Sequence, residues 1–335
     1  MNIGLLTWCG LFAAFSALGT WGARAYAVRR RLLDAPGERR SHQVATPRGG
    51  GLGIVFALML ACAALLIRMP LMVVVLAAGG LGLLLVAAVG AWDDHRPLSP
   101  WLRLAVHALA AGLLATGMVL AGGSATLALS AFVLALVLTN VWNFMDGIDA
   151  LAASQAALVA VALALVGGGP LGLLLGLALA GACLGFLPFN WPRASVFLGD
   201  VGSGALGFAL AWLAALTLDG LPQTQWPLVL LPLSAFLVDA GLTLAVRILR
   251  RERWWTPHVQ HAYQCAARRL GRHGPVAAGY AVWTAIGGIM LLRFRGESIF
   301  GGPMLISIWF AIAAGLWFAL RRGDPAGRRP LQEVA

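Results

Sequence analysis

Apolar runs long enough to cross a membrane make up most of this 335-residue chain. A membrane-spanning helix needs roughly 17 to 25 predominantly apolar residues. With 60% hydrophobic and 11% charged residues, the chain also has too few polar side chains to cover a water-soluble globule of its size. We therefore predict an all-α polytopic membrane protein, folded as a single integral membrane domain over residues 1–335.

About eleven runs satisfy this length. They cover residues 3–23, 50–67, 71–91, 104–121, 125–141, 152–167, 170–188, 203–218, 227–247, 276–292 and 299–320. The first run has no basic residue ahead of it and is followed by Arg24. We expect it to remain as a helix rather than to be cleaved as a secretory signal.

The placement of arginine predicts how these runs are oriented. All but three of the 24 basic residues lie in or beside one set of connections, and the exceptions are Arg68, Arg293 and Arg295. That set comprises the loops near 29–49, 92–103, 142–151, 189–202 and 248–275 and the tail 321–335. Because arginine-rich short loops stay on the cytoplasmic side, the N-terminus is predicted outside and the C-terminus inside. No soluble basic face is visible despite the net charge of +11, so no nucleic-acid partner is expected.

Five of the thirteen acidic residues fall in three short segments within this apolar sequence. They are Asp93, Asp94, Asp146, Asp149 and Asp200. Burying an ionised carboxylate in hydrocarbon is costly unless it is paired, bound to a metal or facing water, so acids at this depth indicate function. The predicted topology puts all five on the cytoplasmic face with two loop histidines, His258 and His261. We expect these residues to form one cytoplasmic active site.

The polar segments contain four motifs in a fixed order. They are Thr46-Pro47-Arg48-Gly49-Gly50, Asp93-Asp94, Asn140-x-x-Asn143-Phe144-Met145-Asp146-Gly147-Ile148-Asp149, and Asn190-Trp191-Pro192-x5-Leu198-Gly199-Asp200-Val201-Gly202-Ser203. This pattern resembles the polyprenyl-phosphate N-acetylhexosamine-1-phosphate transferase family, of the glycosyltransferase family 4 type. His258-x-x-His261 followed by Tyr263-Gln264 is similar to the branch that initiates O-antigen synthesis.

The resemblance implies a reaction between two anionic substrates. An N-acetylated amino-sugar 1-phosphate would pass from a UDP-sugar to undecaprenyl phosphate in the bacterial cytoplasmic membrane, with release of UMP. Mg²⁺, or alternatively Mn²⁺, would neutralise and align the phosphates. The expected partners are the UDP-N-acetyl amino sugar, undecaprenyl phosphate and membrane lipid, and a homodimer stays open. The product would initiate O-antigen or a related envelope polysaccharide.

The resemblance also assigns roles to the acids nearest the predicted helix ends. Asp200, which follows Gly199 at the start of a predicted helix, is matched to the Mg²⁺ ligand; a helix N-cap is the alternative. Asp93 and Asp94 are matched to residues that deprotonate or orient the lipid phosphate. Because a phosphomonoester is already mostly dianionic at neutral pH, positioning or metal contact is an equal contender for Asp93. If both acids ionise they need a metal or an arginine, and Arg96 or a distant loop arginine could serve.

Asn140, Asn143, Asp146 and Asp149 recur every third residue. On an ideal helix each such step moves about 60° around the axis, so the four cannot share one narrow face unless Gly147 lets the helix break. Our hypothesis is that Asn143 and Asp146 face the pyrophosphate and the sugar. Asp149 recognises the uracil, as the resemblance implies. The alternative is hydrogen bonding between helices.

Further residues match the family's substrate-binding positions. Asn190 and Phe197 match a uracil pocket in which an amide pairs with the base and a ring stacks on it, an interaction worth about 1–3 kcal/mol. Arg48, or Arg40, would take the place of a lysine that some members place near the nucleotide. The glycines of 49–53 are expected to allow close helix packing, because no strand precedes them as in a dinucleotide loop.

The loop histidines are assigned to catalysis by resemblance only. In the family this region closes over the phosphates or the sugar, often with a His-x-His-His motif, and this chain departs from that motif. The alternative for the segment around Trp254 and Trp255 is an anchor at the membrane interface.

Three other readings of the whole chain stay open at this point. A pentapeptide-carrying phosphotransferase of peptidoglycan synthesis fits less well, because the His258 to Gln264 segment differs from that branch. A secondary transporter or lipid flippase would place its acids near the midplane and often shows internal symmetry, which is not apparent in this sequence. A noncatalytic scaffold is the third reading.

The replacement Asp149→Asn tests the assignment of this acid to the nucleotide. We expect weaker binding of the UDP-sugar and little change in binding of the polyprenyl phosphate, because a contact to uracil is lost. Separate measurements of affinity for the two substrates check this. A larger loss for the lipid would remove the assignment.

Overall fold

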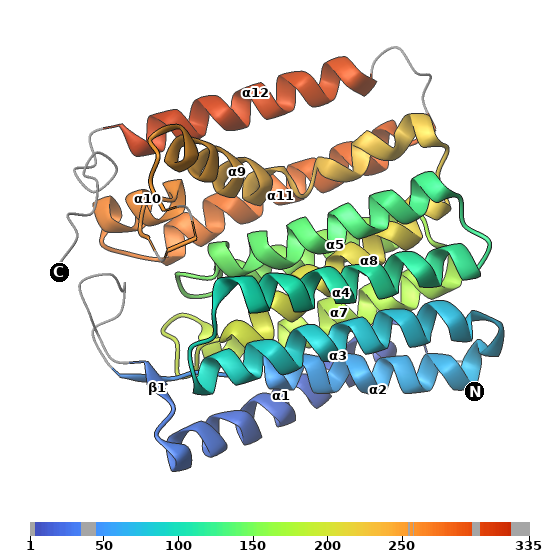
Figure 1. Cartoon of the computed structure of the whole chain (residues 1–335), viewed down its shortest axis with the longest axis horizontal. Coiled ribbons are helices and arrows are strands. Elements are labelled where there is room, and N and C mark those ends of the chain that lie inside the picture. The colour runs from blue at the N-terminus through green and yellow to red at the C-terminus, as the bar shows by residue number, and fades with distance from the viewer. Residues whose placement is uncertain (1–3, 35–44, 254, 257, 297–301, 323–335) are drawn as a thin grey trace.

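The computed structural model describes the chain except for residues 1–3, 35–44, 254, 257, 297–301 and 323–335. Long helices lie side by side along one direction (Figure 1). The elements are α1 (Leu5–Arg30), β1 (Leu33–Asp34), β2 (Thr46–Pro47), α2 (Leu52–Arg68), η1 (Pro70–Met72), α3 (Val73–His95), α4 (Pro100–Leu120), α5 (Ala125–Met145), α6 (Leu151–Val166), α7 (Gly169–Asn190), α8 (Asp200–Asp219), η2 (Gln223–Leu230), α9 (Ser234–Leu249), α10 (Ala262–Leu270), α11 (Gly274–Phe294) and α12 (Gly302–Arg321).

The prediction of an all-α polytopic membrane protein is confirmed. Among the described residues, eight helices are long and apolar enough to cross a membrane, and η2 with α9 forms a further candidate that is bent by 75°. Two shorter apolar helices, α2 and α6, coincide with the remaining predicted runs. The number of actual crossings stays a prediction.

Several helices extend further than the apolar runs that predicted them. The first ends at Arg30 rather than near residue 23, and α3 continues to His95, so Asp93 and Asp94 lie in its last turn and not in a loop. A length criterion detects the part of a helix in hydrocarbon, whereas a polar last turn at the interface stays helical. The helix α10 was not predicted, because its nine residues are too few to form an apolar run.

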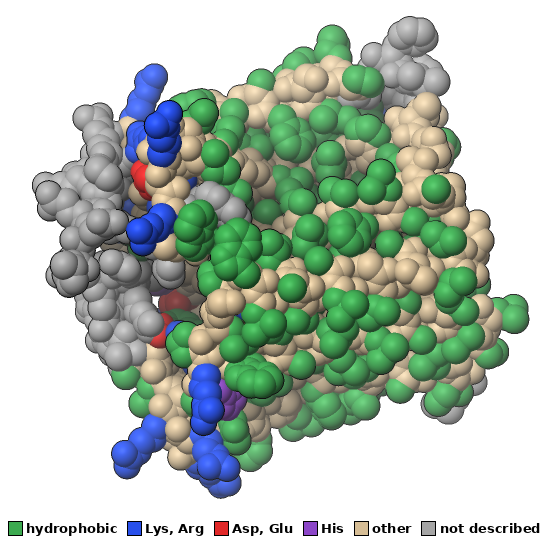
Figure 2. Space-filling model, viewed as in Figure 1, with side chains coloured by type: hydrophobic (Ala, Val, Ile, Leu, Met, Phe, Trp, Pro, Cys, Tyr) green, Lys and Arg blue, Asp and Glu red, His purple; other side chains and the backbone are tan. Residues whose placement is uncertain are grey.

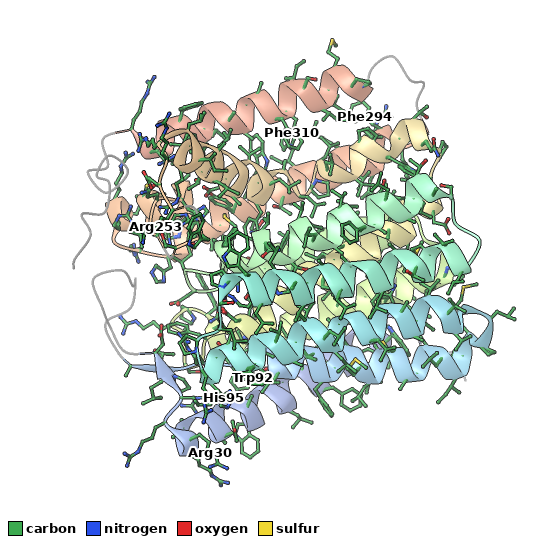
Figure 3. The ribbon with its side chains drawn as sticks, in the orientation of Figure 1. Arg30, Trp92, His95, Arg253, Phe294 and Phe310 are labelled. Atoms are coloured by element: carbon green, nitrogen blue, oxygen red, sulfur yellow. The ribbon has the colours of Figure 1, made fainter. Side chains whose placement is uncertain are left out.

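The polar residues gather at one end of the bundle. Figure 2 shows hydrophobic side chains over the length of the visible face, while most of the basic and acidic side chains lie at one end. Arg30, Trp92, His95 and Arg253 lie at this end, and Phe294 lies at the opposite end (Figure 3). We call the end with Arg30 and Arg253 the polar end. Its assignment to the cytoplasmic side stays a prediction.

The helix α8 lies in the middle of the bundle and begins at the polar end. Its contacts are mainly with α3 and α5, with further contacts to α2, α6 and α7. Residues Val201–Leu218 are all buried, as expected for a helix that is apolar on every side. Because the helix is surrounded, the residue at its first position, Asp200, is presented to several neighbouring helices at once.

Small residues allow the helices to approach closely near the start of α8. A side chain at Gly51 would collide with the backbone of Gly202, and one at Gly53 would collide with Thr20 of α1. The predicted use of the 49–53 glycines in close packing is therefore confirmed at these two positions. The expectation that no strand precedes these glycines is wrong, because β2 (Thr46–Pro47) ends just before Gly49 and pairs with β1, Leu33 opposite Pro47. This pair is two residues long and antiparallel, unlike the parallel βαβ unit of a dinucleotide loop.

The replacement Gly185→Ala tests the contact between α1 and α7. An added Cβ at Gly185 would collide with the backbone carbonyl of Ala13, so we expect a loss of about 1–3 kcal/mol and a lower thermal midpoint in detergent. The matched control is Gly112→Ala, at a helical position in α4 where the added Cβ meets nothing within 4 Å. Equal midpoints for the two variants would contradict this packing argument.

Candidate active site

Arg103 joins two of the predicted site acids. Its Nη1 donates to Oδ2 of Asp93 at 2.8 Å and to Oδ2 of Asp200 at 3.0 Å. Arg103 lies in the first turn of α4, which packs on α3, so its side chain reaches back to the last turn of α3. Sequence analysis named Arg96 or an unspecified loop arginine for this purpose, and the structure assigns it to Arg103, the last residue of the predicted loop 92–103. The available signal was an arginine directly before the apolar run 104–121.

Asp94 holds the first turn of α8. Its two carboxylate oxygens accept hydrogen bonds from the backbone N–H groups of Asp200 (3.0 Å) and Val201 (3.1 Å), and its side chain is 5% exposed. The N-cap position itself is Gly199, which has no side chain to serve as a cap. The alternative that Asp200 is an N-cap is therefore wrong, because Asp94 of α3 supplies the capping oxygens instead.

Asn143 is the third partner of Asp200. Its amide nitrogen donates to Oδ1 of Asp200 and to Oγ of Ser203, both at 3.0 Å. One turn earlier in α5, Asn140 donates to the carbonyl of Leu136 in its own helix at 2.7 Å. A pocket of about 70 Å³ lies between these residues and is lined by Asn140, Asn143, Asp200, Arg103 and His107 among others. This volume suits a small group and not a whole nucleotide sugar.

The third-residue pattern from Asn140 is interrupted where α5 ends at Met145. Asp146 occupies the C-cap position, one residue before the expected break at Gly147, and Ala150 has a left-handed backbone with φ of 63°. Burial, together with the nearby carboxylates of Asp200, Asp94 and Asp149, raises the pKa of Asp146 to about 8. The carboxylate of Asp146 is therefore close enough to that of Asp200 for their negative charges to repel each other.

The residues assigned to the nucleotide lie in adjoining loops. Oδ2 of Asp149 lies 3.3 Å from Nδ1 of His273 and accepts a bond from the backbone N–H of Ala194 at 3.4 Å. Asn190 is 7% exposed, accepts from the N–H of Ala150 at 2.7 Å and donates to the carbonyl of Val196 at 3.1 Å. Both ends of its amide thus join two loops, and one N–H and one oxygen lone pair of the amide are left for a base.

The first polar loop borders the same region. Arg48 donates to Asp34 at 2.7 Å, and its Nη1 lies 4.0 Å from Oδ1 of Asp94. The backbone N–H of Phe197 donates to the carbonyl of Pro47 at 2.8 Å, which fixes this half-buried residue beside the loop. Arg40, the other candidate arginine, lies outside the described residues.

The two predicted loop histidines stack on each other. Their ring centroids are 4.9 Å apart, and the ring of His261 also stacks at 6.5 Å on that of Phe144. Burial, together with the nearby His261 and Arg247, lowers the pKa of His258 to about 3. Trp255 packs against Trp101 and lines the pocket near Asp200; Trp254 lies outside the described residues.

The described residues do not include a preformed cluster of metal ligands. Among the described residues, no three histidine, cysteine or acidic side chains converge in a way that could hold a metal ion. Asp200 nevertheless has three oxygen- or amide-bearing side chains close to it. They are Asn143, the hydroxyl of Ser203 that bonds Asn143, and Asp93, which shares Arg103 with Asp200. Mg²⁺ is commonly bound by one or two carboxylates, with phosphate oxygens and water completing its shell. The donor set around Asp200 fits that mode.

Known proteins resemble this chain over nearly its whole length. A family model described as glycosyl transferase family 4 matches residues 73–218, the part that contains Asp93 to Asp200. The decaprenyl-phosphate N-acetylglucosaminephosphotransferase of Mycobacterium tuberculosis is 31% identical over 94% of this chain and 89% of that protein. The protein of the same name from Mycolicibacterium smegmatis is 30% identical over 96% and 90%. A phospho-N-acetylmuramoyl-pentapeptide-transferase of Synechococcus sp. is 35% identical over 59% of each chain.

The replacement Asp146→Asn tests the raised pKa of this acid. The folded state keeps the proton up to a pKa of about 8, whereas the unfolded chain releases it near the ordinary value of 3.8. This group therefore destabilises the folded state progressively as the pH rises from about 4 to about 8. We expect Asp146→Asn to gain stability relative to the original chain across that window, by on the order of a few kcal/mol.

Thermal midpoints in detergent at several pH values check this expectation. The matched control is Asp219→Asn, at an exposed acid in the last turn of α8. A midpoint difference for Asp146→Asn that stays constant from acid to alkaline pH would contradict it.

Proposed function

The chain belongs to the polyprenyl-phosphate N-acetylhexosamine-1-phosphate transferases of glycosyl transferase family 4, and from this membership we propose that it transfers such a sugar phosphate from a UDP-sugar to undecaprenyl phosphate. The attacking oxygen of the lipid phosphate forms a bond to the β-phosphorus of the UDP-sugar. The bond between that phosphorus and the bridging oxygen breaks, and UMP leaves. The observation that carries the proposal is the convergence of Asp93, Arg103, Asn143 and Asp200 at the start of α8.

Asp200 is the residue that would hold Mg²⁺, with Asn143 beside it. When bound, the cation neutralises and aligns the phosphate groups of the two substrates. The carboxylate of Asp200 would supply negative charge to the cation, and the dipole of α8, whose N-terminus it occupies, favours the phosphate groups that the cation would align. Asn143 orients the carboxylate of Asp200 through its 3.0 Å bond.

Asp93 and Arg103 would position the lipid phosphate. Arg103 contacts both Asp93 and Asp200, so its guanidinium lies where an entering phosphate would meet it, and guanidinium groups bind phosphate in a fixed fork geometry. The lipid phosphate is already mostly dianionic near neutral pH. We therefore assign Asp93 to orienting the phosphate and Arg103, and not to removing a proton. Asp94 acts indirectly, through its hold on the first turn of α8.

The nucleotide sugar would bind on the side of the loops that carry Asp149, Asn190, Phe197 and Arg48. Asp146 would lie between this side and Asp200, within reach of the pyrophosphate. His261 packs against Phe144 at the end of α5, which places the loop histidines beside the same segment. Such an arrangement supports closure of the 248–275 loop over the sugar or the phosphates.

N-acetylglucosamine is the first sugar to test, because the relatives that match over most of the chain are named for it. The acceptor we propose is undecaprenyl phosphate, and decaprenyl phosphate is its direct competitor in an assay. The active site would face the cytoplasm in the bacterial inner membrane, and the product would begin O-antigen or a related envelope polysaccharide. The pentapeptide-carrying donor is the alternative, because named pentapeptide transferases match part of the chain.

A release assay tests the proposal directly. Purified protein in detergent should release UMP from UDP-N-acetylglucosamine when undecaprenyl phosphate and Mg²⁺ are present, and a chelator should stop the release. The variant Asp200→Asn should lose at least about 100-fold in rate, because contact with the metal supplies several kcal/mol. Asp219→Asn, at the opposite end of the same helix, is the matched control and should retain full rate.

Three outcomes would point elsewhere. Release only with a pentapeptide-carrying donor would favour the peptidoglycan branch. Passage of substrate across vesicles without UMP release would favour a transporter. Retention of function in cells by Asp200→Asn would favour a scaffold.

A further inference from the structure

Asp239 is a buried acid that the proposed chemistry does not use. It lies in α9 and is 2% exposed. Its Oδ1 accepts from the N–H of Ala262 at 2.8 Å, and its Oδ2 accepts from the N–H of Tyr263 at 3.0 Å and from the hydroxyl of Tyr280 at 2.7 Å. Nδ1 of His261 lies 3.5 Å from Oδ1. A buried carboxylate with this many donors is held in one orientation.

These bonds fix the beginning of α10. Ala262 and Tyr263 are the first two residues of that helix, and the first N–H groups of a helix have no partner within it. The N-cap residue is His261, whose backbone N–H donates to the side chain of Gln264 at 3.2 Å. The carboxylate of Asp239 therefore sets the position at which α10 begins and, with it, the position of His261.

From α10 the contacts continue to the segment that carries Asp146. The hydroxyl of Tyr263 donates to the carbonyl of Phe144 at 3.2 Å. A side chain at Gly147 would collide with that same hydroxyl, so the segment lies directly against it. The ring of His261 stacks on Phe144. Tyr263 and His261 thus contact the last turn of α5, and Tyr263 also contacts Gly147 in the turn that follows.

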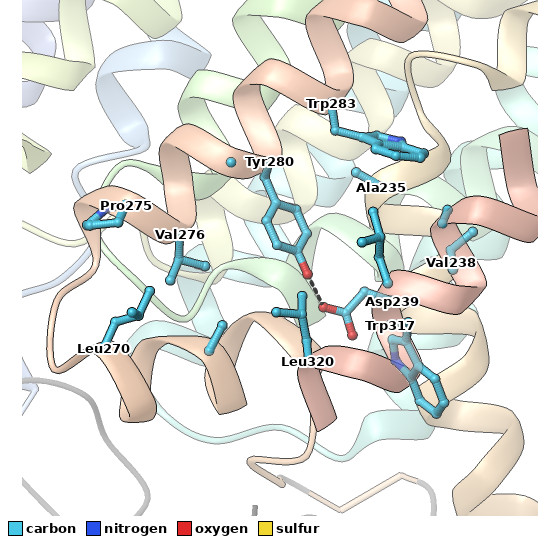
Figure 4. A pocket seen from close by; sticks show the side chains of 14 residues that line it. Ala235, Val238, Asp239, Leu270, Pro275, Val276, Tyr280, Trp283, Trp317 and Leu320 are labelled. Carbon is cyan, nitrogen blue, oxygen red and sulfur yellow. Dashed lines mark hydrogen bonds between the residues drawn. The ribbon is translucent and has the colours of Figure 1, made fainter. Parts of the chain in front are cut away.

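A cavity adjoins α10 on the side of Ala266 and Leu270. A cavity of about 280 Å³ lies between α9, α10, α11 and α12, and Ala266 and Leu270 of α10 line it. Figure 4 shows the hydrogen bond between Tyr280 and Asp239 in the wall of this cavity. Because the side chains of α9, α11 and α12 do not fill this space, the hydrogen bonds at the N-terminus of α10 contribute more to fixing its position.

We propose that Asp239 is a positioning residue for the transfer reaction. It anchors the N-terminus of α10, and His261 and Tyr263 then hold the segment Phe144–Gly147 in place beside Asp200. This inference rests on the proposed function for its catalytic consequence. Its structural part, the anchoring of α10, is independent of that function. The two parts can therefore be tested separately.

Hydrogen exchange tests the anchoring without an activity assay. In Asp239→Asn, one acceptor oxygen is replaced by an amide group, so we expect the N–H groups of Ala262 and Tyr263 to exchange faster by on the order of tenfold or more. Mass spectrometry with fragmentation of the peptide 258–270 resolves these positions. The matched control is Asp219→Asn, and unchanged exchange in Asp239→Asn would overturn the anchoring.

A double-mutant cycle on the rate of UMP release tests the positioning. We expect Asp239→Asn to lower kcat by on the order of 100-fold at a temperature where the variant is folded, because a misplaced group costs about that much. Tyr263→Phe removes the link from α10 to Phe144. If Asp239 acts through that link, the double variant should be little worse than Asp239→Asn alone. Multiplying losses would overturn the positioning role, since a general destabilisation acts independently.

A milder variant keeps the test decisive if Asp239→Asn does not fold. Tyr280→Phe removes one donor and keeps the carboxylate, so we expect a smaller rise in exchange at Ala262 and Tyr263 and a several-fold lower kcat. No change in either measurement would contradict the proposal. If the original chain releases no UMP, the proposed function fails, and the exchange comparison alone decides whether Asp239 anchors α10.

Discussion

The capping of α8 by Asp94 is the interaction on which the rest of the site depends. α8 is the central helix, and its first N–H groups would be left without partners at the polar end of the bundle if α3 did not supply two carboxylate oxygens. With this bond in place, Asp200 projects toward α4 and α5, where Arg103 and Asn143 meet it. The convergence therefore follows from one contact between two helices that are far apart in sequence.

A second helix, α10, is capped by a buried carboxylate in the same way. Asp239 of α9 accepts bonds from two successive N–H groups at the start of α10, as Asp94 of α3 does at the start of α8. In each case a buried carboxylate from one helix fixes the first turn of another. Residues at the start of both helices contact the C-terminal part of α5, Asp200 through Asn143 and Tyr263 through Phe144, and Asp146 follows directly after α5. Two capping carboxylates thus position the helices next to this segment.

Much of the fold and the membership of the site could be predicted, but the pairing within the site could not. The predicted runs found the long apolar helices, and the polar motifs found Asp93, Asp146 and Asp200. The motif did not distinguish Asp94, which caps α8, from its neighbour Asp93, which binds Arg103. Adjacent residues on a helix point in directions about 100° apart, so the two acids meet different partners, which depend on how the helices pack. The motif also left open whether Arg96 or another loop arginine would pair with these acids, and the packing of α4 on α3 brings Arg103 to Asp93.

The sequence by itself determined that this protein is a helical membrane protein of one transferase family, because the length of apolar runs and the order of short motifs are local properties of the chain. Only the tertiary structure decided which acid caps α8, which arginine bridges Asp93 and Asp200, and that Asp239 accepts bonds from the first N–H groups of α10. These depend on which side chains meet across helices. The physical reason is that the partner of a buried charge is chosen by distance and direction in space, and neither is written in the spacing along the chain.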